Sequence, residues 1–143
     1  MSKIMILNGA NLNLLGKREP SIYGFETLGD LEQQLRAAFP GHQFDFRQTN
    51  SEDELIGHIH QAFELKLPVV LNPGAFTHYS YALRDACAAL TSAGGKLIEV
   101  HISNPHSREE FRHNSVISAV ATGVIAGFGL NSYHLAVSEL TRN

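Results

Sequence analysis

Short apolar runs alternate with longer segments of helical spacing along the chain, and this alternation most constrains its fold. The run Lys3–Asn8 is almost continuously apolar, which is typical of a strand covered on both faces. From position 28 to 39, apolar residues recur every three or four positions until Pro40-Gly41 ends the helix-like pattern. The same two patterns then repeat toward the end of the chain.

The repeats predict four further strands: His42–Gln48, Leu67–Leu71, Lys96–His101 and Val120–Phe128. The helix before the strand Leu67–Leu71 is expected to bury Leu55, Ile59, Ala62 and Phe63. The helix after that strand is expected to bury Ala82, Ala86, Leu90 and Ala93. A closing helix, Ser132–Leu140, follows the last strand. Ser51 with Glu54, and Ser107 with Glu110, match the capping-box pattern of a helix N-terminus. The second box predicts that Arg112 lies about one turn inside a short helix.

Strict alternation of strands and helices predicts parallel strands joined by right-handed crossovers. Five such units are too few for a closed eight-fold barrel. We therefore expect residues 1–143 to form a single α/β domain, a flavodoxin-like open five-stranded parallel sheet with helices on both faces. In such sheets the ligand crevice lies at the carboxyl ends of the strands.

Composition narrows the class of protein. The net charge of −3 favours no nucleic-acid partner, and no apolar run approaches the roughly 20 residues of a membrane span. The N-terminus leads directly into a strand, so no signal peptide is expected. A single cysteine, Cys87, allows no internal disulfide, fits a cytoplasmic protein and is expected to be a small core residue.

The connection after the first strand, from position 8 to 24, is far longer than an ordinary strand-to-helix loop. It carries Arg18 and Tyr23, and its glycines can serve as hinges. We expect it to close over a ligand as a lid. The alternative is an ordered surface loop packed by Leu14 and Leu15.

Two further polar segments follow the third and fourth strands: Asn72–His78 and Glu99–Asn104. Glu99 and His101 are two apart on a strand and therefore face the same side, where a carboxylate can fix the tautomer of a histidine. Alone, His101 could equally be a structural histidine. Its convergence with Asn72, His78, Arg18 and Tyr23 at one rim favours an active site.

Other chemistries fit poorly. The spacing from Gly9 to Lys17 does not match a phosphate loop, and His58 and His60 face different sides of a helix, so no metal site is expected. Ser103 lacks a glycine-flanked elbow, and no lysine is placed for a Schiff base. A tyrosine, two histidines and arginines remain, which suit proton abstraction beside a carbonyl. A tyrosine phenolate near neutral pH needs a pKa shift of two to three units, roughly 3–4 kcal/mol, which a nearby guanidinium such as Arg18 can supply.

The chain resembles the type II 3-dehydroquinate dehydratases almost from end to end. The residues that carry the resemblance are Asn8–Gly16 with Arg18-Glu19-Pro20 and Tyr23-Gly24, Asn72–His78 with Ala82–Asp85, Glu99–Asn104 with Arg108–His113, and Gly123–Gly129. The resemblance implies a flavodoxin-like subunit that uses neither metal nor cofactor. The implied reaction is the trans-dehydration of 3-dehydroquinate to 3-dehydroshikimate through an enolate, in the shikimate pathway that leads to chorismate and the aromatic amino acids.

The resemblance also implies roles for individual residues. Tyr23 would remove the C2 proton as a phenolate, and Arg18 would lower its pKa. A water held by Asn11 would stabilise the enolate. His101, oriented by Glu99, would protonate the departing C1 hydroxyl.

The substrate would be held by side chains and backbone groups from three segments. Asn72 and the backbone N–H groups of Ile102 and Ser103 would bind its carboxylate, while His78 and Arg112 would bind its ring hydroxyls. The resemblance further implies a homo-oligomer, a dodecamer built as a tetramer of trimers. In that assembly, Asp85 would reach the site of a neighbouring subunit.

Four residues depart from the family pattern: Ala10, Tyr79, Tyr81 and Pro105. None of them removes a proposed catalytic group, so they bear on loop mobility and subunit packing. Two readings compete with the enzyme. One is a flavodoxin-like module that binds an anionic nucleotide or flavin without catalysis, and the other is a structural oligomer descended from an enzyme.

Overall fold

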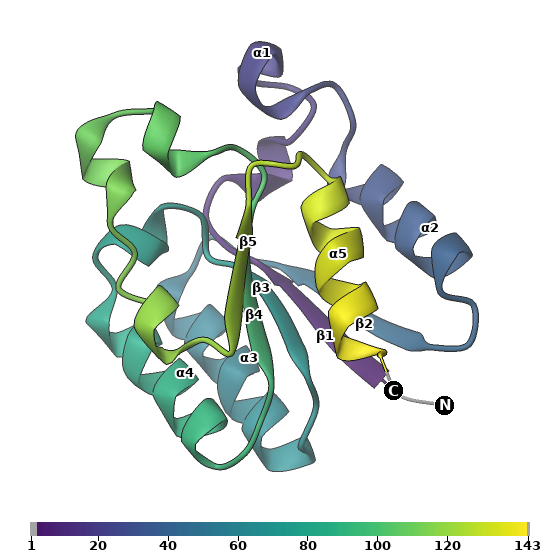
Figure 1. The fold of residues 1–143 in the computed structure, drawn as a ribbon, viewed down its shortest axis with the longest axis vertical. Helices are drawn as coiled ribbons and strands as arrows, with labels where there is room; N and C mark the ends of the chain where they lie inside the picture. Colours follow the sequence, from purple (N-terminus) through teal and green to yellow (C-terminus); the bar gives the residue numbers. More distant parts are fainter. Residues whose placement is uncertain (1–2, 143) are drawn as a thin grey trace.

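The computed structural model describes residues 3–142, and of Tyr23 the backbone alone. Five parallel strands form one sheet in the order β2-β1-β3-β4-β5 (Figure 1). The strands are β1 (Lys3–Asn8), β2 (Gln43–Gln48), β3 (Val69–Asn72), β4 (Leu97–His101) and β5 (Gly123–Ala126). This order is the flavodoxin-like arrangement, so the predicted fold class is confirmed.

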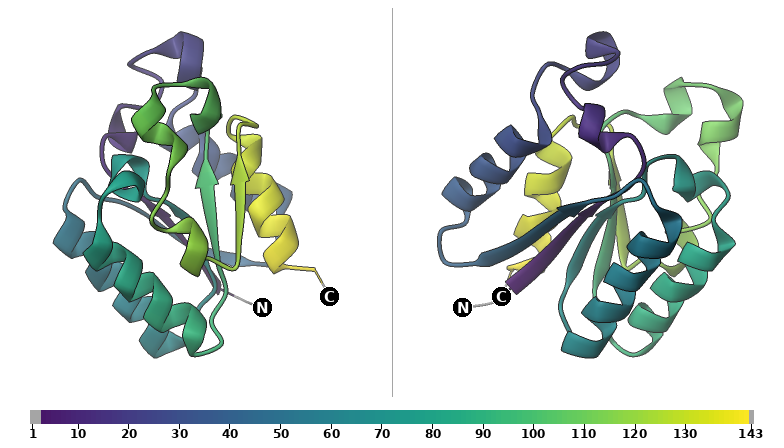
Figure 2. Two further views of the ribbon diagram at one scale, coloured as in Figure 1. Left: turned by 60° about the vertical axis from the view of Figure 1, so that its left-hand side comes forward. Right: turned by 180° about the vertical axis from the view of Figure 1, so that it is seen from behind.

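Four longer helices cover the sheet, two on each face (Figures 1 and 2). They are α2 (Leu28–Ala38) and α5 (Asn131–Leu140) on one face, and α3 (Glu52–Leu65) and α4 (Tyr81–Ser92) on the other. β1 shows why its sequence is almost continuously apolar. Ile4 and Ile6 pack in the core with α2 and α5, whereas Met5 and Leu7 pack in the core with α3 and α4.

The helix starts follow local capping chemistry. Thr27 and Asp30 form a complete capping box at the start of α2, with reciprocal hydrogen bonds of 3.1 and 2.9 Å. At α3 the Ser51 hydroxyl accepts the Glu54 N–H as expected, at 3.2 Å. The return half of that box differs, because the Ser51 N–H donates to the Thr49 hydroxyl instead.

Three predicted burial or boundary details are wrong. Phe63 is 44% exposed, because it lies at the edge of the α3 stripe, roughly 80° around the helix from Leu55. Ala82 and Ala93 are exposed, since the buried face of α4 is formed by Leu83, Ala86, Cys87 and Leu90. β5 is shorter than Val120–Phe128, because a 3-10 turn, η5 (Ser118–Val120), precedes it. Cys87 is buried in the core as expected.

The predicted helix after Ser107 is also wrong. The segment forms two 3-10 turns, η3 (Pro105–Ser107) and η4 (Glu110–His113), with Arg112 in the second. The cap at η3 is Asn104, whose side chain accepts the His106 N–H at 3.0 Å. Ser107 instead donates its hydroxyl to the Asn104 carbonyl at 2.9 Å, so it does not cap a new helix.

The long connections gather at the carboxyl ends of the strands, at the top of Figures 1 and 2. They are the segments after β1, β3 and β4, which lie far apart in the sequence. Among residues 3–142, no helix combines the length and apolar character needed to cross a bilayer.

Candidate active site

A cavity of about 130 Å³ opens at this end of the sheet, between the segments that follow β1, β3 and β4. Most of the predicted site residues line it: Asn11, Arg18, Asn72, His78, His101, Ile102, Ser103 and Arg112. The structure therefore brings together Asn72, His78, Arg18 and His101, four of the five residues whose convergence the strand ends predicted. Ala10 and Pro105, two of the departures from the family pattern, also line the cavity.

The segment after β1 is held close to the turn after β3. The Gly9 N–H donates to the Asn72 carbonyl at 2.8 Å, and a Cβ on Gly9 would lie 2.3 Å from the carbonyl oxygen of Pro73. Only glycine allows this approach. Gly74, in the turn after β3, packs against the backbone of Ala10 in the segment after β1. Its φ of 62° lies in the left-handed region.

Beyond this contact, the segment forms a short 3-10 turn, η1 (Leu12–Leu14), and a helical turn, α1 (Pro20–Tyr23). Leu15 is buried but Leu14 is 39% exposed, so only one of the two expected leucines packs the loop. Arg18 lines the cavity from this segment. The side chain of Tyr23 lies outside the described part of the structure, so its predicted place in the site stays a prediction.

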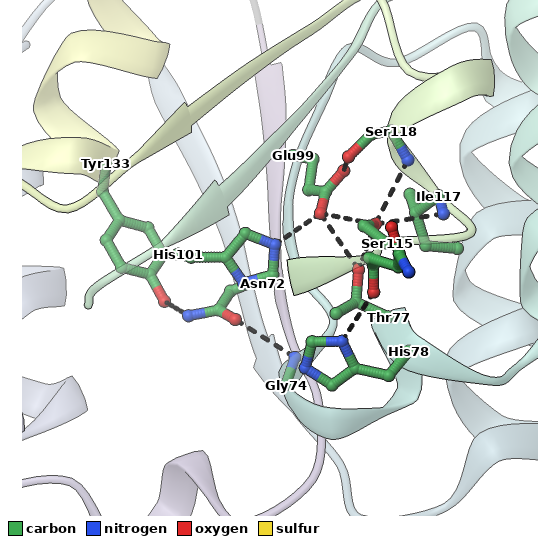
Figure 3. A network of polar contacts seen from close by, with 11 residues as sticks. Asn72, Gly74, Thr77, His78, Glu99, His101, Ser115, Ile117, Ser118 and Tyr133 are labelled. Carbon is green, nitrogen blue, oxygen red and sulfur yellow. Dashed lines mark hydrogen bonds and ion pairs between the residues drawn. The ribbon is translucent and has the colours of Figure 1, made fainter. Parts of the chain in front are cut away.

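Asn72, at the end of β3, is held by a buried chain of hydrogen bonds (Figure 3). Its Nδ2 donates to the Tyr133 hydroxyl at 2.9 Å, and that hydroxyl donates to Asn8 Oδ1 at 2.6 Å. The Gly74 N–H donates to Asn72 Oδ1 at 3.1 Å. Burial raises the pKa of Tyr133 well above its ordinary value, outweighing the opposing hydrogen bond from Asn72, so the hydroxyl remains a donor.

These bonds orient the amide of Asn72. Its oxygen is engaged by the backbone, and one of its two N–H groups is engaged by Tyr133. The second N–H is the group that Asn72 can offer to a ligand in the cavity. Tyr133 was not predicted as part of the site, because in the sequence it reads only as an apolar position of the closing helix.

Glu99 and His101 lie side by side at the end of β4, as their spacing predicted. His101 Nε2 forms a hydrogen bond and ion pair with the Glu99 carboxylate (Figure 3). Because the carboxylate accepts at Nε2, that nitrogen carries a hydrogen and Nδ1 is the position that can exchange a proton with a ligand. His101 itself lines the cavity.

The Glu99 carboxylate is fully buried and accepts hydrogen bonds from three hydroxyls as well. They come from Thr77 at 3.0 Å, Ser115 at 2.8 Å and Ser118 at 2.6 Å. Burial alone would raise the pKa of Glu99, but the hydrogen bonds and the charge of His101 outweigh it and hold that pKa below 4.5. Glu99 is therefore ionised at neutral pH.

His78 is fixed by the segment that follows η4. Its Nδ1 lies 2.8 Å from the Asn114 carbonyl, which can only accept, so Nδ1 carries the hydrogen. Nε2 of the neutral ring is then an acceptor for a ligand. Arg112 is held over the Phe111 ring at 4.6 Å, and its Nε donates to Glu109 at 3.0 Å.

Arg108 also lines the cavity, and no role was predicted for it beyond its place in a family motif. It donates to the Ser103 hydroxyl at 3.2 Å and lies 3.9 Å from the Glu19 carboxylate. Glu19 belongs to the segment after β1, so this ion pair joins two of the three connections that surround the cavity.

Asp85 is the predicted site residue that the fold places apart from this cavity. It lies on α4 with 77% of its side chain exposed, 3.2 Å from Arg84. Its predicted contact with a neighbouring subunit stays a prediction. Within residues 3–142, no group of three or more His, Cys, Asp or Glu side chains is arranged to hold a metal ion.

The cavity combines cations with one oriented proton donor. Three guanidinium groups line it, those of Arg18, Arg108 and Arg112, which favours an anionic ligand. His101, backed by an ionised carboxylate, can deliver a proton to a leaving group. This arrangement suits acid–base chemistry on a small, hydroxylated anion.

Comparisons with known proteins point in the same direction. The family model described as "Dehydroquinase class II" matches residues 2–141. The chain is 57% identical over 140 residues to a 3-dehydroquinate dehydratase of Bacillus licheniformis, covering 96% of this chain and 94% of the relative. It is 56% identical over 140 residues to one of Kineococcus radiotolerans, with the same coverage. The crystal structure of type II dehydroquinase from Propionibacterium acnes superposes with a TM-score of 0.95 at 48% identity, covering 100% and 98% of the two chains.

Proposed function

The chain belongs to the class II dehydroquinase family and is a 3-dehydroquinate dehydratase of the shikimate pathway, and we propose that the reaction takes place in the cavity at the carboxyl ends of β1, β3 and β4. The observation that carries this proposal is the Glu99–His101 pair at the wall of a cation-lined cavity. Dehydration removes a proton from one carbon and a hydroxide from the neighbouring carbon, which together make one water. No electron is transferred overall, so the proposed steps use protein groups and one water and need no cofactor.

The substrate carboxylate binds at Asn72 and at the backbone N–H groups of Ile102 and Ser103. The fixed amide of Asn72 supports this role, because its second N–H is the group it offers to the cavity. Neutral amide N–H groups can bind the carboxylate oxygens through hydrogen bonds, without adding a charge to the site. This end of the substrate is thereby anchored beside the acid.

The ring hydroxyls bind at His78 and Arg112, which line the same cavity. Since His78 Nδ1 donates to Asn114, its Nε2 accepts a hydrogen bond from a substrate hydroxyl. Arg112 donates to hydroxyl oxygens and is kept in place by Glu109 and the Phe111 ring. The two contacts select a hydroxylated ring over a plain aliphatic acid.

Tyr23 removes the C2 proton as a phenolate. The position of Arg18 supports this step, because it lines the cavity five residues before Tyr23 in the same segment. A guanidinium near a phenol favours the ionised form when water is excluded. The enolate oxygen that develops is stabilised by a water held by Asn11, which also lines the cavity.

His101 then protonates the departing C1 hydroxyl. Its Nε2 is engaged by ionised Glu99, so the proton is delivered from Nδ1. Water leaves, and the electrons of the enolate form the new double bond of 3-dehydroshikimate. Base and acid thus come from the segment after β1 and from the end of β4, and the proposed reaction needs both.

The enzyme works as one domain in the cytoplasm, assembled as trimers that form a dodecamer. The exposure of Asp85 on α4 supports its proposed reach into a neighbouring site, because 77% of its side chain faces outward in one subunit. In that site Asp85 binds substrate. Ala10 and Pro105 line the cavity and are therefore expected to affect turnover, whereas exposed Tyr79 and Tyr81 affect subunit packing.

A spectrophotometric assay tests the base. Purified protein given 3-dehydroquinate forms an enone that absorbs in the near ultraviolet, and Tyr23→Phe is expected to lower kcat by about 100-fold or more. Ser92→Ala removes an exposed hydroxyl from α4 and serves as the control. A fully active Tyr23→Phe would overturn the assignment of the base. An inactive wild type that retains a nucleotide or flavin would favour the binding-module alternative.

A further inference from the structure

Glu99 presents an energetic problem that the pair with His101 does not solve alone. Its carboxylate has no exposed surface, and an ionised carboxylate removed from water is costly unless most of its lone pairs accept hydrogen bonds. His101 supplies one donor, to Oε2. Further donors are needed to keep the anion in place through the catalytic cycle.

Three hydroxyls provide them, each from a different position in the chain. Thr77 and Ser115 donate to Oε2, at 3.0 and 2.8 Å, and Ser118 donates to Oε1 at 2.6 Å (Figure 3). We refer to Thr77, Ser115 and Ser118 as the hydroxyl cradle. Both carboxylate oxygens therefore accept from it.

The cradle is arranged to favour the anion over the neutral acid. Ser115 Oγ accepts the backbone N–H groups of Ile117 and Ser118, at 3.1 and 3.2 Å, which use its two lone pairs. Ser115 Oγ also lies 2.5 Å from Thr77 Oγ1, so its single proton goes either to Glu99 directly or to Thr77, whose own hydroxyl donates to Glu99. In both cases Ser115 cannot accept a proton from a neutral carboxylic acid without losing a backbone bond. A neutral Glu99 would therefore require these hydroxyl protons to be rearranged.

This segment is itself firmly attached. The Val116 N–H donates to the Thr77 carbonyl at 2.7 Å, and Ile117 is fully buried in the core beneath α3 and α4. Asn114, at its start, accepts from His78. The cradle therefore ties the turn after β3, the end of β4 and the chain after η4 to one carboxylate.

We propose that Thr77, Ser115 and Ser118 are positioning residues, which keep Glu99 ionised and thereby keep His101 oriented as the acid. This inference rests on the proposed role of His101. It assigns a catalytic purpose to the segment from position 114 to 118, which does not line the 130 Å³ cavity. The hydrogen bonds that hold the pKa of Glu99 below its ordinary value include those of Ser118 and Ser115.

Other titratable groups surround the carboxylate and must be kept constant in a test. A second cavity of about 260 Å³ beside Glu99 is lined by charged or titratable His78, His101, His106, Arg112 and His113. Burial, and then the charge of Glu99, raise the pKa of the Cys87 thiol on α4 to about 12. The cradle hydroxyls can be removed without altering any of these groups.

The test uses the full-length enzyme and two substitutions that each delete one cradle hydroxyl, Ser118→Ala and Thr77→Val. Ser118→Thr retains the hydroxyl, and Ser92→Ala deletes an exposed hydroxyl on α4 as a matched control. Two readouts are followed against pH: kcat with KM, and the infrared band of the protonated Glu99 carboxyl, identified by its loss in Glu99→Gln. Circular dichroism establishes that each variant is folded.

Loss of one charge-assisted hydrogen bond is expected to move the acidic limb of the kcat profile upward by about one pH unit. The pH at which the infrared band of protonated Glu99 appears should rise by the same amount, while KM changes less than about twofold. In Ser118→Thr, the acidic limb and the infrared band should both return to their wild-type pH. The proposal would be overturned if Ser118→Ala and Thr77→Val kept the acidic limb of kcat and the infrared band at the wild-type pH. So would a wild-type Glu99 that is already protonated at neutral pH. Failure of the proposed acid role appears separately, as a His101→Ala variant that keeps its kcat.

Discussion

Removing the buried hydroxyl of Tyr133 tests how the strand ends hold the substrate-binding amide. Tyr133 and Asn8 have no exposed surface, and Asn72 is only 3% exposed. The Tyr133 hydroxyl accepts from Asn72 and donates to Asn8, so Tyr133→Phe leaves one donor and one acceptor without a partner. The phenylalanine ring itself fits the same space.

The cost can be worked from those two groups. A buried polar group that loses its partner costs about 1–3 kcal/mol, so we expect Tyr133→Phe, which leaves two such groups, to lower the free energy of unfolding by about 2–6 kcal/mol. For a chain of this length, that corresponds to a drop in Tm of roughly 5–15 °C. The amide of Asn72 also loses the bond that orients it, so KM for 3-dehydroquinate should rise more than kcat falls.

Urea unfolding and steady-state kinetics at one fixed protein concentration measure both effects, since the proposed assembly would make apparent stability depend on concentration. Ser92→Ala is the control, because it removes an exposed hydroxyl from α4. Stability of Tyr133→Phe within about 0.5 kcal/mol of wild type would refute the reasoning. An unchanged KM would show that Asn72 is oriented by Gly74 alone.

Three further predictions concern ionisation. Glu99→Gln removes the charge behind the acid and should lower kcat by about 100-fold with little change in KM, measured by the enone assay. Burial, and then the charge of Arg47, lower the pKa of His58 below its ordinary 6.5. Folding therefore favours neutral His58, and the stability that this group contributes above about pH 6.5 is lost as the pH falls below that value. Between pH 7.5 and 5, the urea midpoint of His58→Gln should therefore fall less than that of wild type. An equal fall in the two proteins would contradict this sign. Cys87, with its thiol pKa raised to about 12, should react with a thiol reagent at pH 8 only on unfolding, and rapid labelling of the native enzyme would count against its burial.

The layered fold was predictable because the two periodicities report burial directly. β1 is covered on both faces, so an apolar run without alternation was enough to place it within a parallel sheet. The meeting of Asn72, His101 and Arg18 then followed from the rule that parallel strands end at one edge. Helix faces were less certain, because alanines such as Ala82 and Ala93 carry little information on which side is buried.

The parts of the site that could not be predicted depend on long-range packing. Ser115 and Ser118 lie in a segment without periodicity, and their purpose is visible only once Glu99 lies beside them. Ser107 matched a helix cap by spacing alone, but Asn104 occupies that role over a shorter turn. Tyr133 is hidden in the pattern of α5, because an aromatic ring on a buried helix face gives no sign that its hydroxyl reaches Asn72.

In the proposed mechanism Tyr23 removes the C2 proton and His101 protonates the departing hydroxyl, and hydrogen exchange at C2 tests this assignment most directly. NMR of 3-dehydroquinate in deuterated water follows replacement of the C2 hydrogen separately from dehydration. If Tyr23 forms the enolate and His101 only expels the hydroxyl, His101→Ala should still exchange C2 while dehydration falls by about 100-fold or more. Tyr23→Phe should lose both. Exchange that persists at the wild-type rate in Tyr23→Phe, or disappears in His101→Ala together with dehydration, would contradict the account.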